Sequence, residues 1–433
     1  MGSSFYQLEP QGQCSGSVQV PGDKSISHRA VMLASLAEGV CLIDGFLPST
    51  DCEATLAAFK SMGVQMEALS PTKIRIHGVG LKGLKSPQGE LNMGNSGTAM
   101  RLMSGILAGQ EFSSTLVGDE SLTARPMKRI QIPLQDMGAN LALSNQGTPP
   151  LRVQPSNGLH SIDYQLPVAS AQVKSCVLLA GLYAQGRTCV EENVRSRDHT
   201  ERMLQAFSYP IEIEDNRVCL SGGKQLTAIN IDVPGDISSA AFFIVGALLS
   251  KTTELVIKNV GVNPTRDGVI EILRRMGANI EISNGKTFGA EPVADLVVKS
   301  SELKGIEIPQ HLIAKSIDEF PILFIAAACA QGTTRLNGAQ ELRVKESDRI
   351  HNMVIGLQKL GIDVDEKPDG LIIRGGKIKG GEVDSGGDHR IAMAFAMASL
   401  VSAEMMIVRN TDNVVTSFPG FVDSASQLGL RFK

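Results

Sequence analysis

The 433-residue chain contains no tryptophan, and aromatic residues make up only 4% of it. Hydrophobic residues account for 42% and charged residues for 20%, which are ordinary fractions for a globular protein. The hydrophobic core must therefore be built mainly from Leu, Ile, Val, Met and Ala. A chain of this length has room for two or three domains.

Basic residues are not in excess, because 41 Lys and Arg are outnumbered by 45 Asp and Glu. Proteins that bind nucleic acids or anionic membranes usually carry a basic surplus, so we expect neither partner. The longest apolar run, 239–249, is shorter than the roughly 20 residues that cross a bilayer. The first ten residues lack the basic-then-apolar pattern of a signal peptide, and we expect a cytoplasmic protein.

The seven cysteines are scattered, and no CxxC pair occurs among them. This arrangement is untypical of a disulfide framework or a structural zinc site, and it fits a reducing cytosol. Most of these cysteines lie beside apolar residues, which predicts buried free thiols. The sequence also lacks a nucleophilic triad, a metal-ligand cluster, a Walker loop and a dinucleotide-binding fingerprint. We therefore expect no metal and no organic cofactor.

The sequence does contain an internal repeat of about 70 residues. An Ala- and Leu-rich amphipathic run, preceded by a small or acidic residue, begins near Asp23, Asn95, Ser170, Asp236, Asp318 and Asp388. Each run is followed in phase by a helix end that turns into an alternating strand. Five of these helix ends carry a Gly, which predicts a left-handed helix cap, and the third carries Ser208 instead. The sequence thus predicts six α/β units.

The tetrapeptide Val-Pro-Gly-Asp occurs twice, at 20–23 and 233–236. This duplication indicates two homologous halves, so we expect an α/β protein with two lobes of three units each. The segment before Pro21 could belong to either lobe.

Positively charged residues gather where the repeated helices are expected to begin. A helix N-terminus is already the positive end of a dipole, so a cation there lowers stability unless an anion binds. The alternative for any single residue is a solvated surface cation. The residues concerned are Lys24, His28, Arg29, Arg101, Arg125, Lys128, Arg129 and Arg390. Pro126, which follows Arg125, is typical of a first helical residue.

A further cluster lies at 343–349, with the sequence RVKESDR. On a helix, Lys345 and Arg349 would be like-charged neighbours, and an anionic ligand would relieve their repulsion. Glu346 lies among these cations and could transfer a proton, although a salt-bridged exposed face is equally compatible. The residues alone predict a two-lobed α/β enzyme that binds a small polyanion.

Five segments resemble the EPSP synthase family, and the resemblance spans essentially the whole chain. They are PGDKSISHR at 21–29, GNSGTAMR at 94–101, LTARPM at 122–127, RVKESDR at 343–349 and DHR at 388–390. The resemblance implies two domains, each a pseudo-threefold arrangement of three α/β units. It also implies that the N-terminal strand joins the C-terminal domain, so the expected lobes are 21–235 and 1–20 plus 236–433. A monomer is implied as well.

The activity implied by the resemblance is transfer of the enolpyruvyl group of phosphoenolpyruvate to the 5-hydroxyl of shikimate 3-phosphate, a step towards chorismate and the aromatic amino acids. The implied phosphoenolpyruvate residues are Lys24, Gly97, Arg125, Gln172, Arg349 and Arg390. The implied shikimate 3-phosphate residues are Lys24, Ser25, Arg29, Ser170, Ala171, Gln172, Arg197, Asp318 and Lys345. Asp318 would accept the hydroxyl proton, while Glu346 or Lys24 would protonate the donor's methylene carbon.

Two positions depart from part of the family. No Lys precedes Ser417-Phe418-Pro419, where one subgroup carries one, and Ala171 replaces a Ser. Both features resemble the second class of the family, whose members are often less sensitive to the inhibitor glyphosate. Gly97 leaves room where some tolerant members place Ala, so we expect intermediate tolerance.

Three other functions remain open at this point. UDP-N-acetylglucosamine enolpyruvyl transferases share the fold and the donor, but they use a loop Cys, and no Cys lies between 53 and 175. A non-catalytic polyanion-binding protein would not need both Asp318 and Glu346. An RNA-end-processing relative is disfavoured by the acidic net charge.

Overall fold

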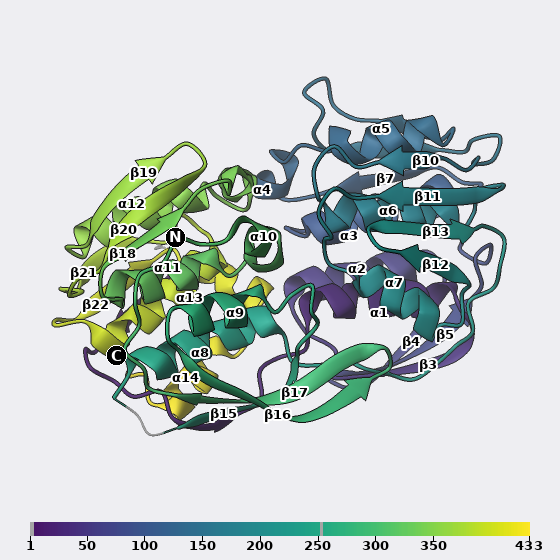
Figure 1. Cartoon of the computed structure of the whole chain (residues 1–433). Helices are drawn as coiled ribbons and strands as arrows, with labels where there is room; N and C mark the ends of the chain where they lie inside the picture. Colours follow the sequence, from purple (N-terminus) through teal and green to yellow (C-terminus); the bar gives the residue numbers. More distant parts are fainter. Residues whose placement is uncertain (1–3, 252–253) are drawn as a thin grey trace. The chain divides into compact units, whose positions relative to one another are not determined.

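The computed structural model describes residues 4–251 and 254–433, which form two compact units (Figure 1). The N-terminal unit consists of 22–233 together with 287–291. The C-terminal unit consists of the described residues up to 21, of 234–286 and of 292–433. The predicted lobes differ from these units at 21, at 234–235 and at 287–291. Residues 287–291 belong with the N-terminal unit because two of them contact side chains of that unit. The carbonyl of Ala290 accepts a hydrogen bond from Arg202, and the carboxylate of Glu291 lies beside the His199 ring.

The N-terminal unit contains three four-stranded sheets. The first comprises β14 (Ile231–Asp232), β3 (Glu38–Asp44), β5 (Lys73–Val79) and β4 (Gln65–Ser70) in that order. The second comprises β6 (Leu91–Asn92), β7 (Ser114–Val117), β9 (Leu151–Gln154) and β8 (Asn140–Ala142). The third comprises β10 (Asp163–Gln165), β11 (Arg187–Glu191), β13 (Arg217–Ser221) and β12 (Ile211–Glu214).

The helices of this unit follow the same threefold repetition. The inner helices are α1 (Lys24–Leu36), α3 (Gly97–Ala108) and α6 (Ala171–Gly181). The second helix of each repeat is α2 (Thr50–Ser61), α5 (Lys128–Asp136) or α7 (His199–Ala206), and the short α4 (Glu120–Thr123) precedes α5. Nearly every residue of α3 is buried, as expected of a helix surrounded by protein.

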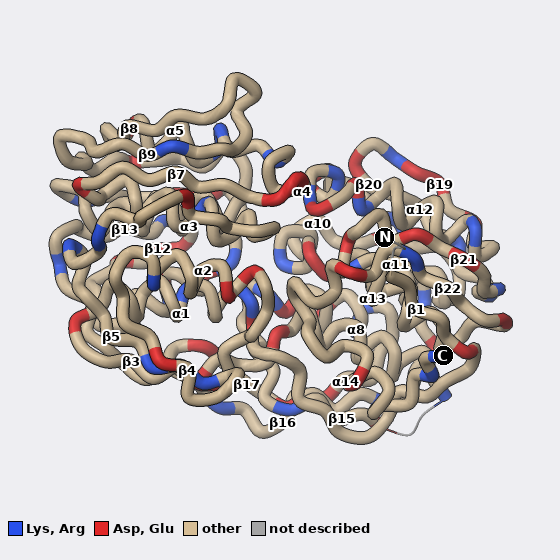
Figure 2. The backbone as a smooth tube through the Cα atoms, turned by 180° about the vertical axis from the view of Figure 1, so that it is seen from behind, with Lys and Arg blue, Asp and Glu red and all other residues tan. Residues whose placement is uncertain are grey.

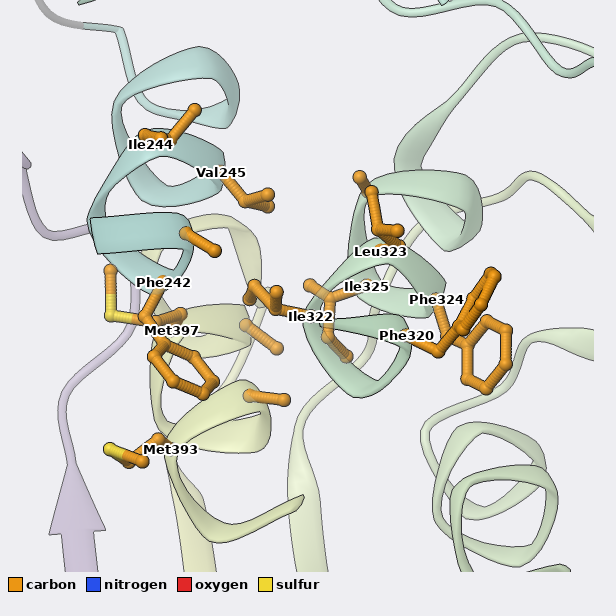
Figure 3. Packing of buried hydrophobic residues seen from close by; sticks show 14 of the residues in the cluster. Phe242, Ile244, Val245, Phe320, Ile322, Leu323, Phe324, Ile325, Met393 and Met397 are labelled. Atoms are coloured by element: carbon orange, nitrogen blue, oxygen red, sulfur yellow. The ribbon is translucent and has the colours of Figure 1, made fainter. Parts of the chain in front are cut away.

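The C-terminal unit repeats this plan. Its first described sheet comprises β16 (Asn279–Phe288), β17 (Glu291–Lys299), β15 (Leu255–Gly261) and β2 (Gly16–Val18) in that order. The second comprises β18 (Thr333–Leu336), β20 (Gly370–Arg374) and β19 (Asp363–Lys367). The third comprises β1 (Phe5–Leu8), β22 (Met406–Arg409) and β21 (Gly381–Asp384). Its longer helices are α8 (Ile237–Leu249), α9 (Gly268–Arg275), α11 (Phe320–Cys329), α12 (Arg349–Lys359), α13 (His389–Ala398) and α14 (Phe421–Leu428), and the short α10 (Gln310–Ile313) precedes α11. Side chains of α8, α11 and α13 pack together in its core (Figure 3).

The six predicted repeats are confirmed by the positions of α1, α3, α6, α8, α11 and α13, each of which begins within two residues of a predicted start. Asp23, Ser96, Ser170, Asp236 and Asp388 cap five of these helices by accepting a hydrogen bond from a backbone N–H of the first turn. Such caps stabilise a helix start by about 1 kcal/mol each. Four of the six residues that mark the repeat, Asp23, Ser170, Asp236 and Asp388, are therefore helix caps, whereas Asn95 and Asp318 are not.

The second marker of the repeat is confirmed as well. Gly63, Gly138, Gly277, Gly361 and Gly429 follow helices with φ between 87° and 111°. Ser208 occupies the corresponding place in the third repeat and also has a positive φ, 59°. A left-handed residue here lets the chain reverse from the helix into the next strand.

At two passages of the chain from one unit to the other, a strand and the helix that follows it belong to different units. Strand β2 precedes α1 in sequence, yet it pairs in parallel with β15 of the C-terminal unit. Strand β14 precedes α8, yet it pairs in parallel with β3 of the N-terminal unit. Each Val-Pro-Gly-Asp sequence therefore follows a strand of one unit and leads into the first helix of the other.

The expectation of free thiols was wrong for one pair of cysteines. Cys189 and Cys219 form a disulfide, with Cα atoms 4.1 Å apart. They lie directly opposite each other on the antiparallel strands β11 and β13, and both are buried. Cys14, Cys41, Cys52, Cys176 and Cys329 are free, and burial raises the pKa of each of these thiols.

This pairing predicts the outcome of a thiol count. Alkylation of the unfolded protein without reductant should modify the five free cysteines, and prior reduction should raise the number to all seven. Intact-mass spectrometry would count the modified thiols. Seven modifications without reductant would show that Cys189 and Cys219 are thiols in the purified protein.

Candidate active site

The first cation predicted to bind a substrate, Lys24, is the first residue of α1. Its ammonium group forms an ion pair with Asp51 of α2, whose side chain is almost fully buried. The Lys24 side chain keeps 19% of its surface exposed. Asp51 therefore offsets the unfavourable placement of a cation at the positive end of the α1 dipole.

Arg101, Arg125 and Gln172 form a second group, at the start of α3. Arg101 Nη1 donates a hydrogen bond to Gln172 Oε1 (2.5 Å), and Gln172 Nε2 donates to Thr98 Oγ1 (2.9 Å). Arg125 Nη2 donates to Asn95 Oδ1 (2.6 Å). These contacts hold two buried guanidinium groups and one amide around the first turn of α3.

Gly97, the first residue of α3, lies between the two guanidinium groups. A Cβ atom added to it would lie 3.0 Å from Arg101 Nη1 and 3.3 Å from Arg125 Nη1. The absence of a side chain therefore leaves space beside the two guanidinium groups that a methyl group would fill.

A third group surrounds the buried Arg29 of α1. Arg29 Nε donates to Thr200 Oγ1 (2.7 Å), Nη2 to Ser175 Oγ (2.8 Å) and Nη1 to the carbonyl of Ser25 (2.9 Å). Burial lowers the pKa of Arg29 to about 10, a change that Glu201 opposes and Arg197 reinforces. At neutral pH Arg29 therefore still carries its charge.

The other predicted residues of this unit lie on neighbouring segments. Ser170 caps α6, and Ala171 and Gln172 are the first two residues of that helix. Arg197 is half-buried in the loop between β11 and α7. Lys24, Ser25, Arg29 and these four residues are thus gathered at the beginnings of α1, α6 and α7.

In the C-terminal unit, the predicted residues gather around Arg349, whose side chain is 1% exposed. Its Nε donates to Asp388 Oδ2 (2.8 Å) and its Nη2 to Glu346 Oε2 (2.5 Å). Its Nη1 lies 3.5 Å from Asp318 Oδ1. Burial would lower the pKa of Arg349, but Asp388, Glu346 and Asp318 outweigh it and raise that pKa. The same pairing holds the pKa of the fully buried Asp388 below its usual value, although burial acts to raise it.

Lys345 and Arg390 complete this arrangement on either side of Asp318. Lys345 Nζ lies 3.6 Å from Asp318 Oδ1, and Arg390 Nη1 donates to the Asp318 carbonyl (3.2 Å). Asp318, Lys345, Glu346, Arg349 and Arg390 are therefore brought together within one unit.

Two local expectations about helices were wrong. Lys345 and Arg349 do not share a helix, because Asp348 caps α12 and starts it at Arg349, while the preceding 3₁₀ helix ends at Val344. Pro126 is not a first helical residue, because α5 begins at Lys128 and Arg125 lies in the connection from α4. Arg343, also in the cationic cluster, bonds Asp348 and two backbone carbonyls, which gives it a structural role.

Sequence reasoning did not foresee the contacts by which three residues hold the predicted ones in place: Asp51, Arg101 and Asp388. Arg101 and Asp388 occur in the recognised motifs, but their partners Gln172 and Arg349 lie 71 and 39 residues away in sequence. Asp51 is the second residue of α2, and its position in the sequence does not reveal its ion pair with Lys24. Spacing alone could not have identified these contacts.

Charges of both signs are distributed through both units (Figure 2). Within 4–251 and 254–433, the structure contains no group of His, Cys, Asp or Glu residues arranged to hold a metal ion. None of the helices in these same ranges is long and apolar enough to cross a membrane.

Fold and site together define a two-unit α/β enzyme whose helix starts carry cations suited to phosphate and carboxylate groups. The chain belongs to the EPSP synthase family, because the model of that family, EPSP synthase (3-phosphoshikimate 1-carboxyvinyltransferase), matches residues 8–425. This confirms the resemblance predicted from five short segments.

Individual relatives and solved structures agree with this membership. The chain is 58% identical over 425 residues to the 3-phosphoshikimate 1-carboxyvinyltransferase of Methylococcus capsulatus, covering 98% of this chain and 97% of the relative. It is 55% identical over 433 residues to that of Hydrogenovibrio crunogenus, with 98% and 97% covered. The structure of EPSP synthase from Acinetobacter baumannii matches with a TM-score of 0.89 at 50% identity, covering 99% of both chains. The predicted fold is thereby confirmed.

The buried His28 connects helices of the candidate site, and its protonation makes the stability of the fold depend on pH. Its Nδ1 lies 2.7 Å from Thr55 Oγ1 and its Nε2 lies 3.2 Å from Ser96 Oγ, so it connects α1 with α2 and with the cap of α3. Burial lowers the pKa of His28 well below its usual value, and the charges of Lys24 and Arg29 lower it further. The folded protein therefore holds this imidazole neutral.

Acidification should destabilise the protein through His28. Below about pH 6.5 the unfolded chain binds a proton at this residue that the folded protein excludes, so stability falls by up to about 1.4 kcal/mol per pH unit. Urea unfolding at several pH values should show a smaller acid slope for His28→Gln, whereas the exposed His77→Gln should keep the native slope. An unchanged slope in His28→Gln would contradict this assignment.

Proposed function

We propose that the chain transfers the enolpyruvyl group of phosphoenolpyruvate to the 5-hydroxyl of shikimate 3-phosphate, giving 5-enolpyruvylshikimate 3-phosphate and phosphate. Membership of the EPSP synthase family supports this reaction. The structural observation that supports it best is one buried guanidinium, Arg349, with the carboxylates of Asp318 and Glu346 beside it. The addition moves two protons and therefore requires a base and an acid, and Asp318 and Glu346 could take these roles.

The two substrates are both polyanions, and the cationic groups divide between them in our proposal. The residues that we propose for the donor are Lys24, Gly97, Arg125, Gln172, Arg349 and Arg390. Arginine suits this task because its planar fork binds carboxylate and phosphate through two parallel hydrogen bonds.

The acceptor would use the group around Arg29. Ser25, Arg29, Ser170, Ala171, Gln172 and Arg197 would surround it, together with Lys24, Asp318 and Lys345. The hydroxyls and guanidinium groups of this set can donate hydrogen bonds to the acceptor's phosphate, and Lys345 lies close enough to Asp318 to orient its carboxylate.

The chemistry proceeds by addition and then elimination. The acceptor hydroxyl attacks the central carbon of phosphoenolpyruvate while Asp318 accepts its proton and the methylene carbon is protonated. The resulting tetrahedral ketal then loses phosphate together with a methyl proton and becomes the enol ether. Glu346 is our proposed acid for the methylene carbon, and Lys24 is the alternative.

We also propose that the enzyme works as a cytoplasmic monomer, with small-molecule partners, no metal and no organic cofactor. The net charge of −4 supports the expectation that neither nucleic acid nor membrane is a partner. A reducing compartment would oppose the Cys189–Cys219 disulfide.

A phosphate-release assay tests the proposed function. Phosphate should be released from phosphoenolpyruvate in the presence of shikimate 3-phosphate but not of UDP-N-acetylglucosamine. Glu346→Gln should lower kcat by about 10²-fold or more, since it removes a proton donor. Glu341→Gln, a nearby half-buried glutamate with no assigned role, is the control. Release with the nucleotide sugar, or with neither acceptor, would contradict the proposal.

The position of Gly97 predicts a selective effect on the donor. In Gly97→Ala the new methyl group would crowd Arg101 and Arg125, so KM for phosphoenolpyruvate should rise about tenfold while KM for shikimate 3-phosphate stays nearly constant. Inhibition by glyphosate should weaken in parallel. Gly89→Ala, where a Cβ would meet no atom within 4 Å, serves as the control. Equal changes in both KM values would argue against a donor site at Gly97.

A further inference from the structure

A buried cluster of three ionised side chains lies behind the group around Arg29. Lys174, whose side chain is 1% exposed, extends from the first turns of α6. Its Nζ lies 2.6 Å from Glu192 Oε2 and 2.7 Å from Glu201 Oε1, and both glutamates are equally buried. We call these three residues the Lys174 cluster.

Each member of the Lys174 cluster comes from a segment that carries residues of the proposed acceptor site. Lys174 itself lies four residues after Ser170, and its N–H donates to the Ser170 carbonyl (3.0 Å). Glu192 directly follows β11 on the segment that leads to Arg197, and its Oε2 accepts a hydrogen bond from the N–H of Ser196 (3.2 Å). Through Glu192, the Lys174 ammonium group therefore links the start of α6 to the loop that ends at α7.

The third segment connects the cluster with Arg29. Glu201 belongs to α7 and follows Thr200, whose Oγ1 accepts the hydrogen bond from Arg29 Nε. Ser175, which follows Lys174, accepts from Arg29 Nη2, and its Oγ lies 2.7 Å from Thr200 Oγ1. The two residues that fix the Arg29 guanidinium are thus direct neighbours of cluster members in the chain.

The charges of Arg29 and the Lys174 cluster balance one another. Lys174 and Arg29 supply two positive charges, and Glu192 and Glu201 supply two negative ones. Burial acts to lower the pKa of Lys174, but Glu201 and Glu192 outweigh it and raise that pKa, so the ammonium stays charged. Glu201 also acts on Arg29 electrostatically. Without Lys174, Glu192 and Glu201 would both lose their ion-pair partner, and Glu201 would still act electrostatically on Arg29.

We propose that Lys174 is a positioning residue for the acceptor's phosphate group: it engages Glu192 and Glu201, and thereby keeps Arg29 and the loop carrying Arg197 available to the substrate. This inference rests on the proposed function for the identity of the substrate. Lys174 does not touch the substrate in this assignment. By holding Glu192 and Glu201 in ion pairs, Lys174 prevents these carboxylates from competing with the phosphate for the same guanidinium groups.

The test compares KM values in three variants. Lys174→Met should raise KM for shikimate 3-phosphate between about tenfold and a hundredfold, with KM for phosphoenolpyruvate nearly unchanged. Lys73→Met is the matched control, because it removes a lysine from an ion pair with Asp44 that is partly exposed. It should change neither KM.

The double variant Lys174→Met with Glu192→Gln separates positioning from stability. It removes the excess buried charge, so its melting temperature should recover towards that of the native protein. Glu201 still competes for Arg29, so KM for shikimate 3-phosphate should remain high. A KM that returns to the native value together with the melting temperature, or one that is unchanged in Lys174→Met, would overturn the proposal. The double variant also provides the measurement if Lys174→Met does not fold.

Amide hydrogen exchange gives a readout that does not depend on turnover. The Ser196 N–H, which bonds Glu192 in the native protein, should exchange faster in Lys174→Met than in Lys73→Met. If the native protein releases no phosphate with shikimate 3-phosphate, the proposed function fails, while exchange at Ser196 still tests the positioning role. Native exchange at Ser196 in Lys174→Met would contradict that role whatever the substrate.

Discussion

Positive charge held at the beginnings of helices is the constraint on which the candidate active site depends. Such a charge is opposed by the helix dipole and, where it is buried, by the loss of hydration. In the structure a carboxylate lies beside each of two such cations: Asp51 beside Lys24, and Asp388 beside Arg349. These partners hold the cationic groups in fixed positions before any ligand arrives, which lowers the cost of ordering them on binding.

The same constraint explains why buried carboxylates surround a site meant for anions. Arg349 contacts Asp388, Glu346 and Asp318, yet in our proposal only the last two take part in proton transfer. Asp388 is fully buried and also caps α13, so its task is to hold the guanidinium. In the N-terminal unit the division is similar, since Glu192 and Glu201 are engaged by Lys174 while Arg29 bonds neutral hydroxyls. Charge pairing thus separates the groups that bind substrate from those that support them.

Much of the fold could be predicted from the sequence because its repeat is marked by residues with a local physical function. Asp, Ser and Gly recur where a helix must be capped or a left-handed residue is needed, so six helix starts and five glycine caps could be located. Features that depend on distant partners could not. The Cys189–Cys219 pair follows from the register of β11 and β13, and the membership of 287–291 follows from contacts with His199 and Arg202. The start of α12 at Arg349 was missed because the cap at Asp348 was read as part of a continuous charged helix.

The central claim is that cations at helix starts of the N-terminal unit bind the phosphate of the acceptor. Titration calorimetry of the native protein with shikimate 3-phosphate and with unphosphorylated shikimate tests it directly, since the two ligands differ only in that group. Our account predicts that loss of the phosphate weakens binding by about a hundredfold or more, because several charge-assisted hydrogen bonds disappear. Equal affinities for the two ligands would contradict it.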